Sequence, residues 1–75
     1  MATPAEQENA STLKVVWERI GNLPEAQRQA LILVGAEGRT YEEAASALGC
    51  QVGTVKSRVS RARAVLALEL GVAFA

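Results

Sequence analysis

The chain has 75 residues, 49% of them apolar, and its eight basic and eight acidic side chains cancel to a net charge of zero. A single domain of this length has a marginal core, so packed helices or a partner must stabilise it. One cysteine, Cys50, excludes an internal disulfide, and the lack of histidine removes the usual zinc ligands. We therefore expect neither a metal nor a cofactor.

The apolar fraction is too high for a disordered chain, yet no run approaches the roughly 18 apolar residues of a membrane span. The first residues, MATPAEQENAS, lack the basic start and apolar stretch of a secretory signal. The sequence thus predicts a soluble protein of the reducing cytoplasm, with no membrane partner.

The zero net charge hides a polarity along the chain. Residues 1–49 hold four basic and seven acidic residues, a net charge of −3, whereas residues 50–75 hold four basic residues and one acidic residue, a net charge of +3. A concentrated positive segment on a neutral protein favours local contact with phosphates over general affinity for polyanions.

The first half predicts two helices. Residues 1–10 are expected to be a flexible tail and residues 11–75 a helical domain, with Ser11 as the N-cap of the first helix. The apolar spacing of this helix predicts that Trp17 lies in its core-facing stripe, which is Leu13, Val16, Trp17 and Ile20. Pro24, as the first helical residue, opens a second helix that ends near Ala36. Its expected inward residues are Leu23, Ala26, Ala30, Leu33 and Val34.

The second half predicts two more helices, which makes the fold all-α with four helices. Thr40 and Glu43 have the spacing of a capping box and begin a short third helix, YEEAASAL, which ends at Gly49. A longer fourth helix starts within two residues of Gln51, a poor N-cap. Its apolar stripe is Val52, Val55, Val59, Ala62 and Leu66.

A tight glycine turn between two helices, the second of them basic, is typical of a helix-turn-helix without a wing. Ala45 is small where the helices would cross, Gly49 lies in the turn, and Val55 would lock the pair together. Many helical proteins have these three residue types at this spacing by chance, so the interpretation also depends on the polar face of the last helix.

That polar face is narrow and bordered by cations. At about 100° per residue, the residues opposite the apolar stripe are Gly53, Ser57, Ser60 and Ala64. Lys56 and Arg63 flank them on one side and Thr54 and Arg61 on the other. Such a ridge suits a DNA major groove, where the centre approaches base edges and the flanks reach phosphates.

Arg58 lies nearer the apolar stripe, so it is either a structural partner of Glu42 or Glu43 or a DNA ligand. The two glutamates form no catalytic dyad, because Glu43 is expected to cap its helix and no nucleophile or metal cluster accompanies it. Cys50 is expected to be a small buried residue of the turn. We expect no enzymatic activity.

Residues 23–64, LPEAQRQALILVGAEGRTYEEAASALGCQVGTVKSRVSRARA, carry a more specific signal. The runs LP, YEEAA, GC, VGTVKSR and RAR, together with Arg28 and Gly38, resemble region 4 of bacterial extracytoplasmic-function (ECF) sigma factors. The stretch ALILVGAEG resembles the alphaproteobacterial general-stress-response group of that family.

This resemblance implies a domain that binds the −35 promoter element and docks on the flap of the RNA polymerase β subunit, with an anti-sigma factor as a further partner. By position, Lys56, Ser57, Ser60 and Arg61 would face the major groove. The expected DNA-binding residues are Thr40, Tyr41, Glu42, Thr54, Lys56, Ser57, Ser60, Arg61 and Arg63. Relatives carry a bulkier side chain at the position of Ser60, which weakens the assignment of a base contact to this residue. The region for the −10 element is absent from this sequence, so we expect an excised domain or a stand-alone relative that does not initiate transcription by itself.

Two alternatives stay open. One is a sigma-like module that binds an anti-sigma factor without DNA, although such a module has no use for phosphate-facing cations. The other is a LuxR-like response-regulator domain, which the LP and GTVKSR runs disfavour. The end of the chain, VLALELGVAFA, either extends the last helix or forms an exposed apolar patch that suggests a partner.

Overall fold

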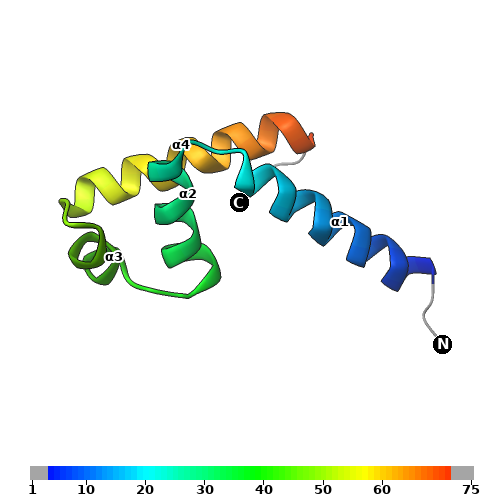
Figure 1. Ribbon diagram of the computed structural model, residues 1–75, viewed down its shortest axis with the longest axis horizontal. Helices are drawn as coiled ribbons and strands as arrows, with labels where there is room; N and C mark the ends of the chain where they lie inside the picture. The colour runs from blue at the N-terminus through cyan, green and yellow to red at the C-terminus, as the bar shows by residue number, and fades with distance from the viewer. Residues whose placement is uncertain (1–3, 72–75) are drawn as a thin grey trace.

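The computed structural model describes the backbone of residues 4–71 and the side chains of residues 13–71. Within this range the fold is all-helical, as the sequence predicts. Its elements are α1 (Pro4–Gly21), α2 (Glu25–Leu31), a π-helical turn η1 (Ile32–Ala36), α3 (Tyr41–Leu48) and α4 (Val52–Leu70). Figure 1 shows α4 lying across α2 and reaching α3 at its first turns, while α1 projects away as an arm. None of these helices is long and apolar enough to cross a membrane.

The first helix begins earlier than the sequence predicted. Residues 4–10 are helical instead of forming a tail, so Ser11 lies inside α1 and does not cap it. Pro4 explains the new start, because proline suits the first helical position, where its missing N–H would be unpaired in any case. The alanine, glutamate and glutamine residues that follow are strong helix formers. Residues 1–3 of the predicted tail lie outside the described range.

The prediction that Trp17 lies in the core is wrong. Trp17 is 51% exposed and Leu13 is 59% exposed, whereas Val16 is half-buried and Ile20 is buried. The apolar stripe exists, but α1 projects from the domain and only its last turns reach α4 (Figure 1). Periodicity identifies the apolar face of a helix and does not show how much of that face is covered.

The second helix begins one residue later than expected, and its last turn is wider than an α-helical turn. Pro24 has φ −52° and ψ 142°, so it is the N-cap and Glu25 is the first helical residue. The last turn is π-helical, and Glu37 N–H donates to the Ile32 carbonyl at 2.9 Å. The predicted end at Ala36 is confirmed.

The inward face of α2 differs by one position from the prediction. Ala26 is exposed, and the half-buried Gln27 takes its place, next to the fully buried Ala30 and to Leu31. The buried and half-buried positions include Leu23, Gln27, Ala30, Leu31 and Val34, a helical stripe that includes position 27 in place of position 26. An apolar-only reading of the helix passes over Gln27 because glutamine is polar.

The third helix has the predicted boundaries at both ends. The Thr40 hydroxyl oxygen accepts a bond from Glu43 N–H at 3.0 Å, and the Glu43 carboxylate accepts one from Thr40 N–H at 2.9 Å. Gly49 has φ 67° and ψ 36°, the left-handed conformation that suits glycine. There Cys50 N–H donates to the Ala45 carbonyl at 3.0 Å and Gly49 N–H to the Ser46 carbonyl at 3.4 Å, which closes the helix end.

The fourth helix is the centre of the core. Four residues of its predicted stripe are buried, namely Val55, Val59, Ala62 and Leu66, and Val52 is half-buried. Ala30 of α2 and Ala44 of α3 are fully buried opposite this helix, and their small side chains let the helices pack closely. The helix continues to Leu70 and ends at Gly71. The segment 65–70 therefore extends α4, whereas residues 72–75 lie outside the described range.

Candidate nucleic-acid interface

The helix-turn-helix consists of α3, the turn Gly49–Gln51 and α4. Ala45 and Val55, the two residues predicted to join the helices, are 5% and 0% exposed. Gln51 has an extended backbone, and its side chain makes no capping bond to α4. Its carbonyl instead accepts from Thr54 and Val55 N–H at 3.0 and 3.2 Å. The turn thus fixes α4 against α3 through the backbone and the buried pair.

The ridge predicted on α4 faces solvent. Gly53, Ser57, Ser60 and Ala64 are all exposed, on the side opposite the buried stripe. Of the flanking residues, Lys56, Arg61 and Arg63 are exposed and Thr54 is half-buried. The buried stripe and the polar ridge lie on opposite faces of one helix, so packing of the stripe fixes the position of the ridge on the domain surface.

The cations of this ridge are free of acidic partners. Within residues 13–71, the ion pairs join Arg28 to Glu25 at 3.9 Å and Arg39 to Glu37 at 3.5 Å. Neither pair involves α4. Lys56, Arg61 and Arg63 therefore have no carboxylate within 4.0 Å among the described side chains, and their charge is available to an external anion.

Arg58 pairs with neither of the two glutamates proposed for it. Its Nη1 donates to the Cys50 sulfur at 3.9 Å, in a half-buried environment. The contact links the turn to the second turn of α4, which gives Arg58 a structural place in the motif. Glu43 is engaged by the capping box instead, and Glu42 is exposed. Cys50 is half-buried, less enclosed than expected.

At the start of α3, the predicted site residues Thr40, Tyr41 and Glu42 differ in availability. The Thr40 hydroxyl oxygen already caps α3 by accepting from Glu43 N–H. The pKa of the Glu43 carboxyl is lowered first by the hydrogen bond from Thr40 N–H and then by the Thr40 side chain. The positive charge of Arg39 lowers it further. Glu43 is thus held as an anion at the N-terminus of α3, where the helix dipole favours negative charge.

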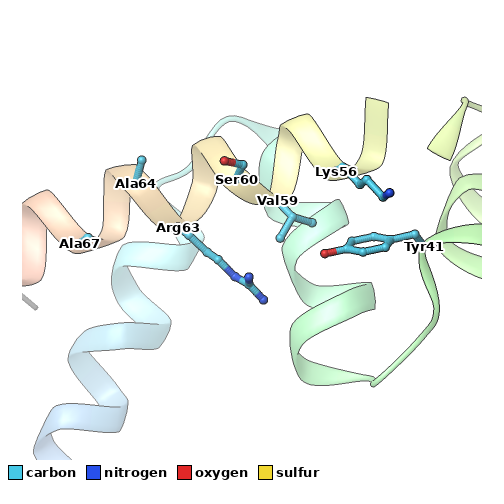
Figure 2. Close-up of a pocket in the computed structure, with 7 residues that line it drawn as sticks. All are labelled: Tyr41, Lys56, Val59, Ser60, Arg63, Ala64 and Ala67. Atoms are coloured by element: carbon cyan, nitrogen blue, oxygen red, sulfur yellow. The ribbon is translucent and has the colours of Figure 1, made fainter. Parts of the chain in front are cut away.

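Tyr41 and Lys56 are brought together across the two helices. The Lys56 ammonium lies 5.5 Å from the centroid of the Tyr41 ring. Both residues line a hollow of about 310 Å³, shown in Figure 2, whose other walls are Val59, Ser60, Arg63, Ala64 and Ala67. The sequence placed Lys56 and Arg63 on one flank of α4, but it gave no sign that Tyr41 faces them from α3.

A second groove, on the side of α1, is apolar. It encloses about 350 Å³, and Arg63 is the one charged residue among those that line it. The others are Leu13, Val16, Trp17, Ile20, Leu31, Ile32, Gly35, Ala36 and Leu66. The exposed indole of Trp17 therefore has a place in a concave apolar surface. Sequence reasoning missed this groove because it assigned Trp17 to the core.

Residues 13–66 match the family described as Sigma-70, region 4. The chain belongs to this family. The family is non-enzymatic and its members are sigma-factor domains, so the LuxR-like alternative is set aside. The match covers the end of α1, the helix-turn-helix and most of α4.

Curated relatives agree with this assignment. The chain is 62% identical over 47 residues to the ECF RNA polymerase sigma factor EcfG of Rhodopseudomonas palustris, a match that covers 63% of this chain and 26% of the relative. It is 42% identical over 65 residues to the ECF RNA polymerase sigma-E factor of Haemophilus influenzae, covering 85% and 34% of the two chains. The Escherichia coli K12 sigma-E factor is 46% identical over 50 residues, covering 67% and 26%. The aligned part is thus between about a quarter and a third of these relatives' length.

Proposed function

We propose that this chain is the domain of an ECF sigma factor that recognises the −35 promoter element. The observation that carries the proposal is the exposed ridge of α4, whose hydroxyls and cations lie opposite a buried stripe and whose cations pair with no carboxylate among the described side chains. A major groove accepts one α-helix, and the polar face of that helix must be free of intramolecular partners to reach the bases. Membership of the sigma region 4 family supports the same mode of binding.

In this mode α4 is the recognition helix. Ser57, Ser60 and Arg61 approach base edges, while Lys56 and Arg63 contact phosphates from the flank. Thr54 lies on the opposite flank, near the other strand. At the start of α3, Thr40 and Glu42 approach the backbone or a base edge, and Tyr41 lies near the backbone beside Lys56. The 62% identity to EcfG supports the prediction of a role within the general-stress-response group.

Fluorescence anisotropy with a panel of −35 duplexes and scrambled duplexes tests this proposal. We expect weak binding to both, with a preference for one −35 sequence, and a slope of log affinity against log salt near about −3, since each phosphate contact contributes about −0.9. Salt-independent binding would contradict the phosphate contacts. Binding of an anti-sigma factor without any DNA binding would favour the sigma-like interaction module instead.

The RNA polymerase core is the second partner that we propose, with the apolar groove as its docking surface. Trp17 and Leu13 are too exposed for core residues and line a groove that no described part of the chain fills. The unpaired Arg63 at its edge suits a partner segment that is apolar and carries a carboxylate. A segment of the polymerase β flap with that chemistry is the occupant we propose.

Binding to core polymerase tests the docking surface. Trp17→Ala should weaken binding by about thirtyfold, as expected when a buried aromatic anchor worth about 2 kcal/mol is removed. Val15→Ala is the matched control, because Val15 is also an exposed apolar residue of α1 but does not line the groove. Equal effects of the two variants would place the docking surface elsewhere. DNA binding should stay unchanged in both.

A further inference from the structure

Lys56 differs from the other cations of the ridge in having an intramolecular partner. Its Nζ lies 5.5 Å from the Tyr41 ring centroid, within the distance of about 6 Å at which a cation is attracted to the face of an aromatic ring. Among the described residues, Arg61 and Arg63 have no comparable contact with a ring or a carboxylate. One of the three exposed cations of α4 is therefore held in place before any ligand arrives.

Tyr41 is the fixed member of this pair. It is half-buried against the core and is the first residue of α3, directly after the capping residue Thr40. The two capping bonds at 3.0 and 2.9 Å hold this turn of the helix. Lys56 is exposed, and its four-carbon stem has several rotamers. The ring thus restricts the ammonium, and the ammonium does not position the ring.

The surroundings of the pair are suited to an anion. Lys56, Ser60 and Arg63 line the same hollow as Tyr41, and no carboxylate lines it (Figure 2). Lys56, Ser60 and Arg63 are separated by four and three residues, so they lie on the same side of α4. An ammonium held over the ring at this hollow remains available to a phosphate oxygen, because a cation–π contact leaves its N–H donors partly free.

We propose that Tyr41 is a positioning residue: its ring, and not its hydroxyl, holds the Lys56 ammonium where a backbone phosphate of DNA binds. This inference rests on the proposed DNA-binding function. The ring reduces the rotamer freedom that Lys56 would otherwise lose on binding, so its contribution depends on the presence of Lys56.

A double-mutant cycle measured by DNA anisotropy tests the proposal. Tyr41→Leu should weaken binding by about 2- to 5-fold, the range expected for an exposed cation–π contact, while Tyr41→Phe, which keeps the ring, should retain the wild-type affinity. Lys56→Met should reduce the salt slope by about 0.9. In the Lys56→Met background, Tyr41→Leu should cause no further loss.

Three results would overturn the proposal. Equal losses for Tyr41→Phe and Tyr41→Leu would assign the effect to the hydroxyl. A loss of the same size in the Lys56→Met background would mean that Tyr41 acts on DNA or on the fold without Lys56. Tighter binding by Tyr41→Leu would mean that the ring withholds the ammonium from DNA.

Proton NMR of the free protein separates this inference from the proposed function. The Lys56 Hε resonances should be shifted upfield by the ring in the wild type and in Tyr41→Phe, and should return to ordinary values in Tyr41→Leu. Absence of the shift in a protein that binds DNA would overturn the positioning role alone. A clear shift in a protein that binds no DNA would overturn the proposed function.

Discussion

The two long helices, α1 with 18 residues and α4 with 19, are stabilised in different ways. In α4 four residues of the apolar stripe are buried, two of them completely and two to 2% exposure, whereas in the described side chains of α1 only Ile20 is buried, at 9%. Helix α4 is held by tertiary packing on α2 and α3. Among the described side chains of α1 most are exposed, so helix-forming residues have a larger share in the stability of this helix.

This difference suits the two tasks that we propose for these helices. A recognition helix must present its side chains at fixed positions, and the buried stripe of α4 provides that rigidity. A docking surface instead needs apolar area that the domain leaves uncovered, and α1 provides it by projecting from the body (Figure 1). The same apolar periodicity therefore stabilises the fold in α4 and leaves an exposed apolar surface on α1.

The largest expected effect is on stability, and it distinguishes two leucines that line the same apolar groove. Leu66 of α4 is 2% exposed and Leu13 of α1 is 59% exposed. Leu66→Ala should lower the free energy of unfolding by about 2 to 5 kcal/mol, because it leaves a cavity in the core. Leu13→Ala should change it by less than about 0.5 kcal/mol. Urea unfolding followed by circular dichroism measures both. Similar losses would mean that α1 is packed as tightly as α4.

The next largest expected effect is on DNA binding, and it distinguishes a cation of α4 from a cation of α1. Arg61 lies on the ridge of α4, and its guanidinium can donate two hydrogen bonds to a guanine edge. Arg61→Ala should cost about 1 to 3 kcal/mol on the preferred duplex and much less on a scrambled one. Arg61→Lys should recover only part of the loss, because an ammonium lacks the planar fork.

Two controls accompany this measurement at one fixed salt concentration. Lys14→Ala removes an exposed cation from α1, away from the ridge, and should leave both affinities unchanged. Arg63→Ala should weaken all duplexes alike, as expected for a phosphate contact. Equal losses on both duplexes for Arg61→Ala would reduce Arg61 to a phosphate contact. No loss on either, with anti-sigma binding intact, would favour the interaction module.

A smaller effect concerns two glycines of the helix-turn-helix. Gly49 has φ +67°, and a Cβ there would meet no atom within 4 Å, so the cost of a side chain comes from the backbone conformation alone. Gly49→Val should destabilise the domain by about 1 to 2 kcal/mol. Gly53 is helical and also has open space around it. Gly53→Ala should therefore stabilise α4 by up to about 1 kcal/mol. An unchanged melting temperature for Gly49→Val would contradict the left-handed turn.

Most of the fold could be predicted because its signals are local. The capping box of α3, the glycine that ends it and the stripe of α4 each depend on residues within a few positions of one another. The errors are of two kinds. The apolar periodicity of α1 begins at Leu13 and gives no sign of the helical turns that start at Pro4, and an apolar stripe does not show whether another element covers Trp17.

The candidate site likewise has features that the sequence predicts and features that it does not. The exposure of Ser57, Ser60 and Arg61 follows from the angle between each residue and the buried stripe, which the sequence contains. The Tyr41 contact with Lys56 and the Arg58 contact with Cys50 depend on how two helices meet. Such contacts between helices have no signature in the spacing of residues, because they depend on how the helices pack in the folded domain.

The smallest expected effect is the pH dependence of the capped helix end. The pKa of Glu43 is lowered first by the hydrogen bond from Thr40 N–H, then by the Thr40 side chain and by the charge of Arg39. A carboxyl whose pKa is lower in the folded state stabilises the fold at pH values above its unfolded pKa, near 4.5. That stabilisation is lost as the pH falls from this value through the folded pKa.

Thermal unfolding of the wild type between pH 6 and pH 3 should therefore show a decrease in melting temperature that is smaller in Glu43→Gln. Glutamine at this position can still accept the bond from Thr40 N–H, so the helix keeps its cap while the titration is removed. Glu42→Gln is the matched control, since Glu42 is the exposed neighbour that has no capping bond. It should keep the wild-type pH dependence. If Glu42→Gln flattened the curve as much as Glu43→Gln, the dependence would arise from the total charge of the first turn, and the capping bond would have no specific share in it.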